Sequence, residues 1–227
     1  MTNELLKRTI TSIILFLFAI FSVFYNSYIF FIVIFLLSCL CWLETNTLIE
    51  AIFRENKIFF LNTLTFFYFF GLFIISCLVL YLEKGPFFFF YILLISMSSD
   101  IGGYVIGNIV GGKKLTKISP NKTISGSLGS FLFSIIPLIF YNYFFKDQYT
   151  LALNNFLFCI GVSLAVQLGD IFISYLKRKA KVKDTGKLLP GHGGLLDRID
   201  GLILAIPFTV IYIFGLSYLK QLLSLIK

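Results

Sequence analysis

The chain has 227 residues, of which 58% are apolar and 19% aromatic, and a formal net charge of +8. A water-soluble domain has about 45–50% apolar residues, so this composition excludes an ordinary soluble globular protein. The 29 phenylalanines lie mostly in continuous runs, which suit hydrocarbon better than the half-buried face of an amphipathic helix. The sequence therefore predicts an all-α fold, a multi-pass transmembrane helical bundle with short polar cytoplasmic loops.

A transmembrane helix needs roughly 17–25 mostly apolar residues. The first apolar run follows Lys7 and Arg8, and we interpret it as a retained span because no small-x-small cleavage site follows it. Only Asn26 and Ser27 separate it from the second run. About seven spans are predicted in total, at residues 9–25, 28–43, 58–82, 86–107, 124–144, 151–175 and 201–224.

The Lys and Arg residues are unevenly distributed among the predicted loops. With a cytoplasmic N-terminus, segments 1–8, 44–57, 108–123 and 176–200 face the cytoplasm and hold two, two, four and seven of the 19 basic residues. Such an excess orients inner-membrane proteins, so we predict a multi-pass protein of the bacterial cytoplasmic (inner) membrane with its N-terminus inside. Topology alone accounts for the charge of the first two segments, whereas the composition of the other two indicates a further role.

Two aspartates interrupt apolar sequence near the predicted cytoplasmic ends of spans. Asp100 lies in S-S-D-I-G-G-Y and Asp170 in Q-L-G-D-I-F-I-S. A charge at membrane depth costs several kcal/mol, so it usually faces a cavity, a cation or a polar partner. For Asp100, a carboxylate wetted at the interface is an equally good interpretation, and Asp170 is the stronger candidate.

A basic and polar segment, G-G-K-K-L-T-K-I-S-P-N-K-T-I-S-G-S, covers residues 111–127 before the predicted fifth span. Ser119 and Pro120 are expected to open the helix of that span, with the proline near its first turn. The N–H groups of the helix start would then point to the same place as the side chains of Lys122, Thr123 and Ser125. That combination favours an anion, and phosphate is the natural candidate.

The longest polar segment, S-Y-L-K-R-K-A-K-V-K-D-T-G-K-L-L-P-G-H-G-G-L-L-D-R-I-D-G, covers residues 174–201. Pro190 and several glycines surround His192, the one histidine of the chain. We expect His192 to donate a hydrogen bond to phosphate rather than to act as a general base, because a phosphate nucleophile is already anionic near neutral pH. Asp197 and Asp200 are three residues apart and therefore share a face of the helix that begins the seventh span.

Carboxylates beside so many cations have two interpretations. They can pair with the neighbouring Lys and Arg side chains. Alternatively, Asp170, Asp197 and Asp200 at one membrane level can form an oxygen-rich site for Mg²⁺, which prefers carboxylates together with substrate phosphates. Cations that hold phosphates, next to acids that hold a divalent metal, are what phosphoryl or nucleotidyl transfer requires.

Residues 174–200 resemble the signature of the phosphatidate cytidylyltransferases, also called CDP-diacylglycerol synthases. Two further segments resemble family motifs in the same order: D-I-G-G-Y with G-N-I-V-G-G-K-K-L within 100–115, and S-P-N-K-T-I-S-G at 119–126. The resemblance covers about the C-terminal half, and the N-terminal spans match in hydrophobic character alone. The matching signature positions are Ser174, Lys177, Arg178, Lys183, Asp184, Pro190, His192, Gly193, Gly194, Asp197, Arg198 and Asp200.

The resemblance implies that CTP and phosphatidic acid react to CDP-diacylglycerol and pyrophosphate, with Mg²⁺ required and a second cation left open. By the same resemblance, Asp170 and Asp197 match the carboxylates of the metal centre, and they join Asp200 and His192 as candidate catalytic residues. Homodimers are known in the family, so a homodimer stays open beside the lipid bilayer as a partner. No nucleic acid is expected, since no aromatic stacking platform accompanies the basic residues. The candidate substrate-binding residues are Ser119, Lys122, Thr123, Ser174, Lys177, Arg178, Lys183, Asp184 and Arg198.

The chain departs from the family pattern in two places. Ile173 stands where family members commonly have Glu, directly before Ser174, and Asn121 and Ser125 replace the usual Lys and Glu beside Lys122. The predicted organisation is a set of N-terminal membrane spans over 1–85 and a catalytic membrane region over 86–227, with cytoplasmic loops at 108–123 and 176–200.

Two other functions stay open. One is a different membrane enzyme that acts on a lipid phosphate, such as a CTP-dependent lipid-alcohol kinase or a CDP-alcohol phosphotransferase. The D-G-x-x-A-R pattern of the latter family is not found around Asp197 and Asp200. The other is a transporter or channel with Asp100 and Asp170 along its path, which would not require a long polar segment rich in phosphate ligands.

Overall fold

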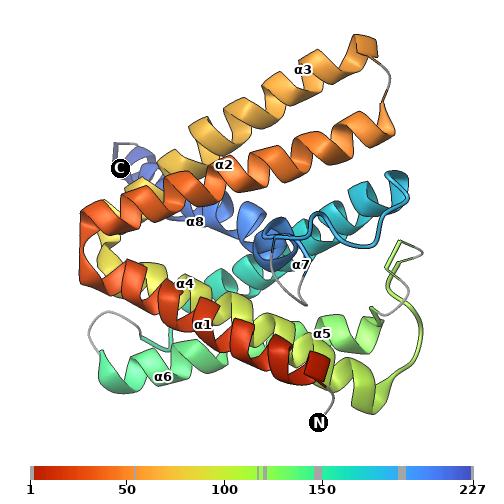
Figure 1. Cartoon of the computed structure of the whole chain (residues 1–227). Coiled ribbons are helices and arrows are strands. Elements are labelled where there is room, and N and C mark those ends of the chain that lie inside the picture. Colours follow the sequence, from red (N-terminus) through yellow and green to blue (C-terminus); the bar gives the residue numbers. More distant parts are fainter. Residues whose placement is uncertain are drawn as a thin grey trace. The chain divides into compact units, whose positions relative to one another are not determined.

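The computed structural model describes residues 3–53, 55–116, 118–119, 122–145, 150–188 and 193–225. Within these residues the elements are all helices and no strand is present, which confirms the predicted all-α class (Figure 1). The chain divides into two compact units. The first comprises Met1–Phe90 and Phe172–Asp200, and the second comprises Tyr91–Ile171 and Gly201–Lys227. The predicted division near residue 85 stays a prediction.

The described helices are those of a multi-pass membrane protein. Large apolar side chains lie exposed on them, for example Phe59 at 82% and Ile109 at 76%, as expected where lipid covers the surface. A shorter apolar helix, Ile10–Tyr25, adds to the long ones, and the count of seven spans stays a prediction. Five helices in the described part of the chain are long and apolar enough to cross a membrane: Ser27–Ile52, Lys57–Val110, Ile124–Phe144, Leu153–Lys179 and Leu196–Gly215.

The first unit begins with α1 (Asn3–Tyr25) and α2 (Ser27–Ile52), which are separated at Asn26 as predicted. The Asn26 side chain accepts a hydrogen bond of 2.9 Å from the Tyr28 N–H and so caps α2. The predicted end of the second span at residue 43 was wrong, because α2 continues through its polar residues to Ile52. Thr45, for example, donates its hydroxyl to the Cys41 carbonyl oxygen at 2.7 Å, so its polar atom is satisfied within the helix.

Three segments follow: α3 (Glu55–Phe66), the π-helical η1 (Phe67–Phe73) and α4 (Ile74–Val110). The first two belong to the first unit, whereas α4 belongs to it up to Phe90 and to the second unit from Tyr91. α3 and η1 pack against α2, and Figure 1 shows α3 and α2 side by side as a helical hairpin. The backbone of α4 leaves the helical conformation at Gly85, where φ is 84°. Glycine adopts this conformation readily, and Pro86 suits the first turn of the helix that follows. This break falls between the predicted spans 58–82 and 86–107.

In the second unit, the predicted fifth span is two helices, α5 (Ile124–Ser134) and α6 (Ile136–Phe144). The interruption precedes Pro137, which has no N–H to donate and whose ring clashes with the carbonyl four residues earlier. The prediction that Ser119 and Pro120 open this span was also wrong. α5 begins after Thr123, whose hydroxyl accepts a 3.0 Å hydrogen bond from the Gly126 N–H and caps the helix.

The last two helices are α7 (Leu153–Lys179) and α8 (Leu196–Leu225), and each belongs partly to both units. α7 therefore includes the first basic residues of the long polar segment, up to Lys179. α8 includes Asp197 and Asp200 in its first turns, as predicted. The connection between the two helices is shorter than the polar segment that the sequence suggested.

Within the second unit, α4 and α5 approach each other closely where both carry glycine. A Cβ added at Gly129 would lie 2.5 Å from the Ile106 Cβ and 2.6 Å from the Gly102 carbonyl oxygen. A Cβ added at Gly102 would lie 2.5 Å from the Gly129 carbonyl oxygen. Small residues at such a crossing let two helices pack backbone to backbone in a membrane.

The Gly129→Ala variant is therefore expected to lose about 1–3 kcal/mol of stability, because the new methyl group forces the two helices apart. Gly215→Ala is the matched control, since a Cβ at Gly215 meets nothing within 4 Å and alanine favours a helix. Thermal unfolding in detergent micelles measures both variants. Equal unfolding temperatures for the two would show that the close crossing of α4 and α5 is wrong.

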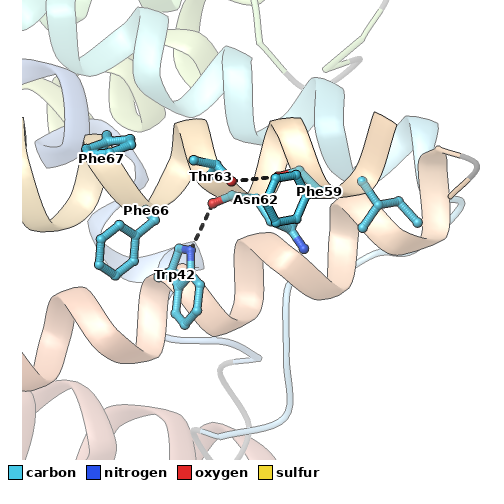
Figure 2. Close-up of a pocket in the computed structure, with 7 residues that line it drawn as sticks. Trp42, Phe59, Asn62, Thr63, Phe66 and Phe67 are labelled. Atoms are coloured by element: carbon cyan, nitrogen blue, oxygen red, sulfur yellow. Dashed lines mark hydrogen bonds between the residues drawn. The ribbon is translucent and has the colours of Figure 1, made fainter. Parts of the chain in front are cut away.

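A pocket of about 570 Å³ lies on the hairpin of α2 and α3 (Figure 2). The Trp42 Nε1–H donates to the Asn62 backbone oxygen at 3.4 Å, and the Thr63 hydroxyl donates to the Phe59 carbonyl oxygen at 2.8 Å. Among the described residues that line this pocket, none carries a carboxylate or an ammonium group. It is therefore a poor place for a phosphate or a metal ion, despite its size.

Candidate active site

A polar pocket of about 320 Å³ lies in the second unit, between α4, the segment before α5, α5 itself and α7. It brings together residues that are far apart in sequence but were singled out by their chemistry. Among the predicted site residues, Ser119, Lys122, Thr123 and Asp170 line it, and Asp100 joins them. The remaining polar lining comes from Ser127, Ser130, Gln167 and Tyr104.

Among the described residues that line this pocket, the charged groups are two carboxylates and one ammonium group. The Lys122 ammonium forms an ion pair with Asp170 Oδ2, and the two side chains are 26% and 30% exposed. Asp100 and Asp170 are close enough to repel each other, while Lys122 attracts Asp100. One cation thus faces two anions, and the excess negative charge would be offset by a further bound cation.

The segment before α5 folds back on itself and brings Lys122 to the pocket. The Leu115 N–H donates to the Lys122 carbonyl oxygen at 2.8 Å, and the Ile124 N–H donates to the Lys113 carbonyl oxygen at 3.0 Å. Its reversal begins at Gly111 and Gly112, whose φ angles of 62° and 103° favour glycine. The glycine pair that the sequence placed beside a basic cluster thus serves the turn that positions Lys122.

A series of hydrogen-bonded polar side chains, buried except for the half-buried Ser127, fixes α7 next to this pocket. The Ser127 hydroxyl donates to Gln167 Oε1 at 2.6 Å, and Gln167 Nε2 donates to the Ser163 hydroxyl at 3.4 Å. The Ser163 hydroxyl in turn lies 2.8 Å from that of Ser99 on α4. Unsatisfied polar groups are costly inside a membrane protein. These hydrogen bonds therefore favour one rotation of α7 about its axis, the one in which Asp170 lines the pocket.

The second charged cluster lies in the first unit and centres on Asp197. Lys177 Nζ lies 2.6 Å from Asp197 Oδ1, and the side chains are 16% and 6% exposed. Asp197 Oδ2 accepts hydrogen bonds from the N–H groups of Thr185 at 2.8 Å and Gly194 at 3.1 Å. Both oxygens of the Asp197 carboxylate are thus held in place. A side chain that binds a metal ion, or a cation such as Lys177 that binds phosphate, needs a fixed position of this kind.

Gly193 allows the polar segment to pass close to Asp197. Its φ is 81°, and a Cβ added there would lie 3.0 Å from both the Asp184 Cβ and Asp197 Oδ2. Asp184 is thereby next to the same turn, although its residue is exposed. Gly193, directly after His192 in the sequence, therefore has a packing role next to Asp197.

The other predicted site residues take different positions. Ser174 and Asp200 are half-buried in α7 and α8, whereas Arg178, Lys183 and Arg198 are exposed. His192 lies outside the described residues, so its role stays a prediction. Ile173, at the position where the family commonly has Glu, is buried with 2% exposure.

Sequence analysis missed Glu44. It was assigned to a segment whose charge served topology alone, yet its carboxylate accepts the N–H groups of Leu195 and Leu196 at 2.9 Å each. Glu44 lies near the middle of a continuous helix, and nothing in its local sequence indicates a partner about 150 residues later. The acidic residue inside an apolar span was the one available signal.

The acidic residues suit Mg²⁺ better than a metal ion whose ligands all come from protein side chains. Within the described residues, no group of three or more His, Cys, Asp or Glu side chains is placed to hold a metal ion. Mg²⁺ is usually bound by one or two carboxylates, with waters and substrate phosphates completing its shell. Asp170 with its neighbour Asp100, and Asp197 in its own cluster, are donors of that kind.

These observations define a class: an integral membrane protein with fixed acidic and basic side chains in the polar parts of its helical bundle. Within this class the chain belongs to the cytidylyltransferase family, whose family model matches residues 54–216, well over half of the sequence. The match confirms the family resemblance that the motifs predicted.

Several curated relatives carry the name phosphatidate cytidylyltransferase. The protein of Rickettsia bellii is 41% identical over 143 residues, which cover 57% of this chain and 60% of the relative. The Helicobacter pylori J99 protein is 38% identical, over 54% of this chain and 46% of the relative. The Bacillus subtilis 168 protein is 37% identical, over 56% and 47%. The chain thus spans about half the length of the curated relatives it matches.

Proposed function

We propose that this protein is a phosphatidate cytidylyltransferase, which converts CTP and phosphatidic acid to CDP-diacylglycerol and pyrophosphate. The observation that carries the proposal is the polar pocket in which Asp100, Asp170 and Lys122 meet within a helical membrane protein. Family membership and the names of the relatives support the same reaction. We further propose the bacterial inner membrane as its location, with residues 108–123 and 176–200 cytoplasmic. A homodimer stays open.

In the proposed reaction the phosphate of phosphatidate attacks the α-phosphorus of CTP. A new P–O–P linkage forms between lipid and nucleotide, the bond between the α-phosphorus and the bridging oxygen breaks, and pyrophosphate leaves with that electron pair. The nucleophile is already anionic, so no general base is required. Positioning and charge stabilisation then supply most of the acceleration.

The basic side chains have a direct task in this scheme, because both reactants are anions that repel each other. Lys122 is proposed to hold phosphate oxygens from its place in the polar pocket, and Lys177, Arg178 and Arg198 are proposed to do so from the second cluster. Mg²⁺, proposed to be held by Asp170 and Asp197, would supply Lewis-acid stabilisation of phosphate charge. Since Lys122 and Lys177 are paired with carboxylates, they are held near the acids before substrate arrives.

The test is the fate of labelled CTP in a reaction with purified protein in phosphatidate-containing vesicles. Label at the α-phosphate should enter the lipid fraction as CDP-diacylglycerol, with one pyrophosphate released per lipid formed. Transfer of label from the γ-phosphate would indicate a lipid kinase instead. Movement of solute across the vesicle membrane without labelled lipid would favour a transporter. Either of these results would contradict the proposal.

Lys122→Ala is expected to raise the KM for CTP or phosphatidate on the order of tenfold to 100-fold, because the polar pocket loses its one ammonium among the described lining residues. Lys113→Ala, in the same basic segment but exposed and not part of the lining, is the matched control. Steady-state kinetics of both variants measure the difference. Equal KM values for the two would remove Lys122 from the proposed substrate site.

A further inference from the structure

Glu44 holds two parts of the first unit that are distant in sequence. From α2 its carboxylate reaches the N-terminus of α8, where Oε1 accepts the Leu195 N–H and Oε2 accepts the Leu196 N–H, each at 2.9 Å. N–H groups at a helix start have no partner within the helix and favour negative charge. A carboxylate fits this pair because each of its oxygens can accept one N–H.

Thr185 links Glu44 to Asp197. Its hydroxyl donates to Glu44 Oε2 at 2.8 Å and lies 3.1 Å from Asp197 Oδ2. The Thr185 N–H donates to the same Asp197 oxygen, and the residue is 6% exposed. A hydroxyl carries one proton, so it can donate to one of the two carboxylates at a time. The positions of the two acids are therefore coupled through one buried residue.

The glycines of the segment are needed for this contact. A Cβ added at Gly194 would lie 2.0 Å from the Thr185 hydroxyl oxygen and 2.4 Å from Glu44 Oε2. A Cβ added at Gly186 would lie 2.6 Å from Glu44 Oε1. The backbone thus approaches the Glu44 carboxylate from two sides, in positions that no larger residue would tolerate without movement.

We propose that Glu44 is a positioning residue for Asp197. It fixes the start of α8 and the turn at Thr185, and these two elements supply the backbone groups around the Asp197 carboxylate. The carboxylate of Glu44 matters because a glutamine in its place has one acceptor oxygen for two backbone N–H groups. The NH₂ group of that glutamine would face the second N–H group, donor against donor. The inference rests on the proposed function for its kinetic consequence, whereas its structural consequence is independent of the reaction.

Amide hydrogen exchange of the full chain in lipid nanodiscs tests the structural part. In Glu44→Gln, the amides of Leu195 and Leu196 are expected to exchange about tenfold faster, since a hydrogen bond to a charged acceptor is lost. Glu50→Gln, at an exposed site on the same helix, is the matched control and should leave them unchanged. Equal exchange in the two variants would overturn the proposal.

A second variant shows whether Thr185 couples the two acids. Thr185→Val removes the hydroxyl but keeps the N–H that Asp197 accepts, so it should accelerate exchange of the Gly194 amide less than Glu44→Gln does. Combined with Glu44→Gln it should add little, because both changes break one shared contact. Fully additive effects would contradict the coupling.

Kinetics separate a positioning role from a merely structural one. Glu44→Gln should lower kcat at least about tenfold and raise the Mg²⁺ concentration for half-maximal rate, with the KM for phosphatidate nearly unchanged. Glu44→Asp keeps the charge and should recover part of kcat. A loss of folded protein with unaltered kcat and Mg²⁺ response would refute positioning. If the unaltered protein formed no CDP-diacylglycerol, the proposed function would fail while the exchange measurements would still test Glu44.

Discussion

The Asp197→Asn variant is expected to lose CDP-diacylglycerol formation by on the order of 10²–10³-fold while the protein remains folded in the membrane. Asparagine has nearly the same shape, so its oxygen can still accept the N–H groups of Thr185 and Gly194. What disappears is the negative charge that pairs with Lys177 and that we propose binds Mg²⁺. The rate of label transfer from CTP to lipid measures the loss, with circular dichroism as the folding check.

Loss of the ion pair alone could also slow the reaction, so Lys177→Met is the companion variant. If Asp197 binds the metal, Asp197→Asn shifts the Mg²⁺ dependence of the rate, and Lys177→Met leaves that dependence in place. Near-normal turnover by Asp197→Asn would contradict the proposed role. An identical Mg²⁺ response of the two variants would reduce Asp197 to a partner of Lys177.

The Asp170→Asn variant should show a loss of similar size, on the order of 10²–10³-fold. Among its described lining residues, the polar pocket then has one carboxylate, Asp100, beside Lys122, so their excess negative charge is gone. Mg²⁺ should bind more weakly, and higher Mg²⁺ should recover part of the rate. Steady-state rates over a range of Mg²⁺ concentrations measure this.

Asp100→Asn is the control within the same pocket. It also removes one negative charge, but Asp100 is not among the positions that match the family's metal centre. We therefore expect a smaller loss and an unchanged Mg²⁺ requirement. If Asp100→Asn abolished the reaction and Asp170→Asn did not, the metal role would belong to Asp100.

The sequence identified charged residues that line the polar pocket, because side-chain type is local information. Asp170 was singled out for a charge in apolar sequence and Lys122 for its place in a basic segment suited to phosphate, and the structure pairs them. Lys177 and Asp197 came from one continuous segment, and they too form an ion pair. Apolar runs, which reflect the thickness of the bilayer, likewise located the membrane helices.

The errors concern properties that depend on distant partners or on exact backbone geometry. The end of α2 was placed too early because polar residues suggested a loop, while Thr45 satisfies its hydroxyl within the helix. Glu44 was overlooked because its partners, Leu195 and Leu196, come together with it only in the folded chain. The start of α5 was misplaced because proline and threonine are both common at helix starts. The side chain that caps α5 by a hydrogen bond is that of Thr123.

We propose that Asp170 and Asp197 each bind divalent metal, which is the role that the family resemblance implies for both. Binding of Mn²⁺, which is visible by electron paramagnetic resonance, to the protein in nanodiscs with CTP present tests it most directly. Each single Asp→Asn change should weaken Mn²⁺ binding strongly, because each removes a carboxylate that we propose to be a metal ligand. Undiminished Mn²⁺ binding in either single variant would contradict the proposed metal role of that aspartate.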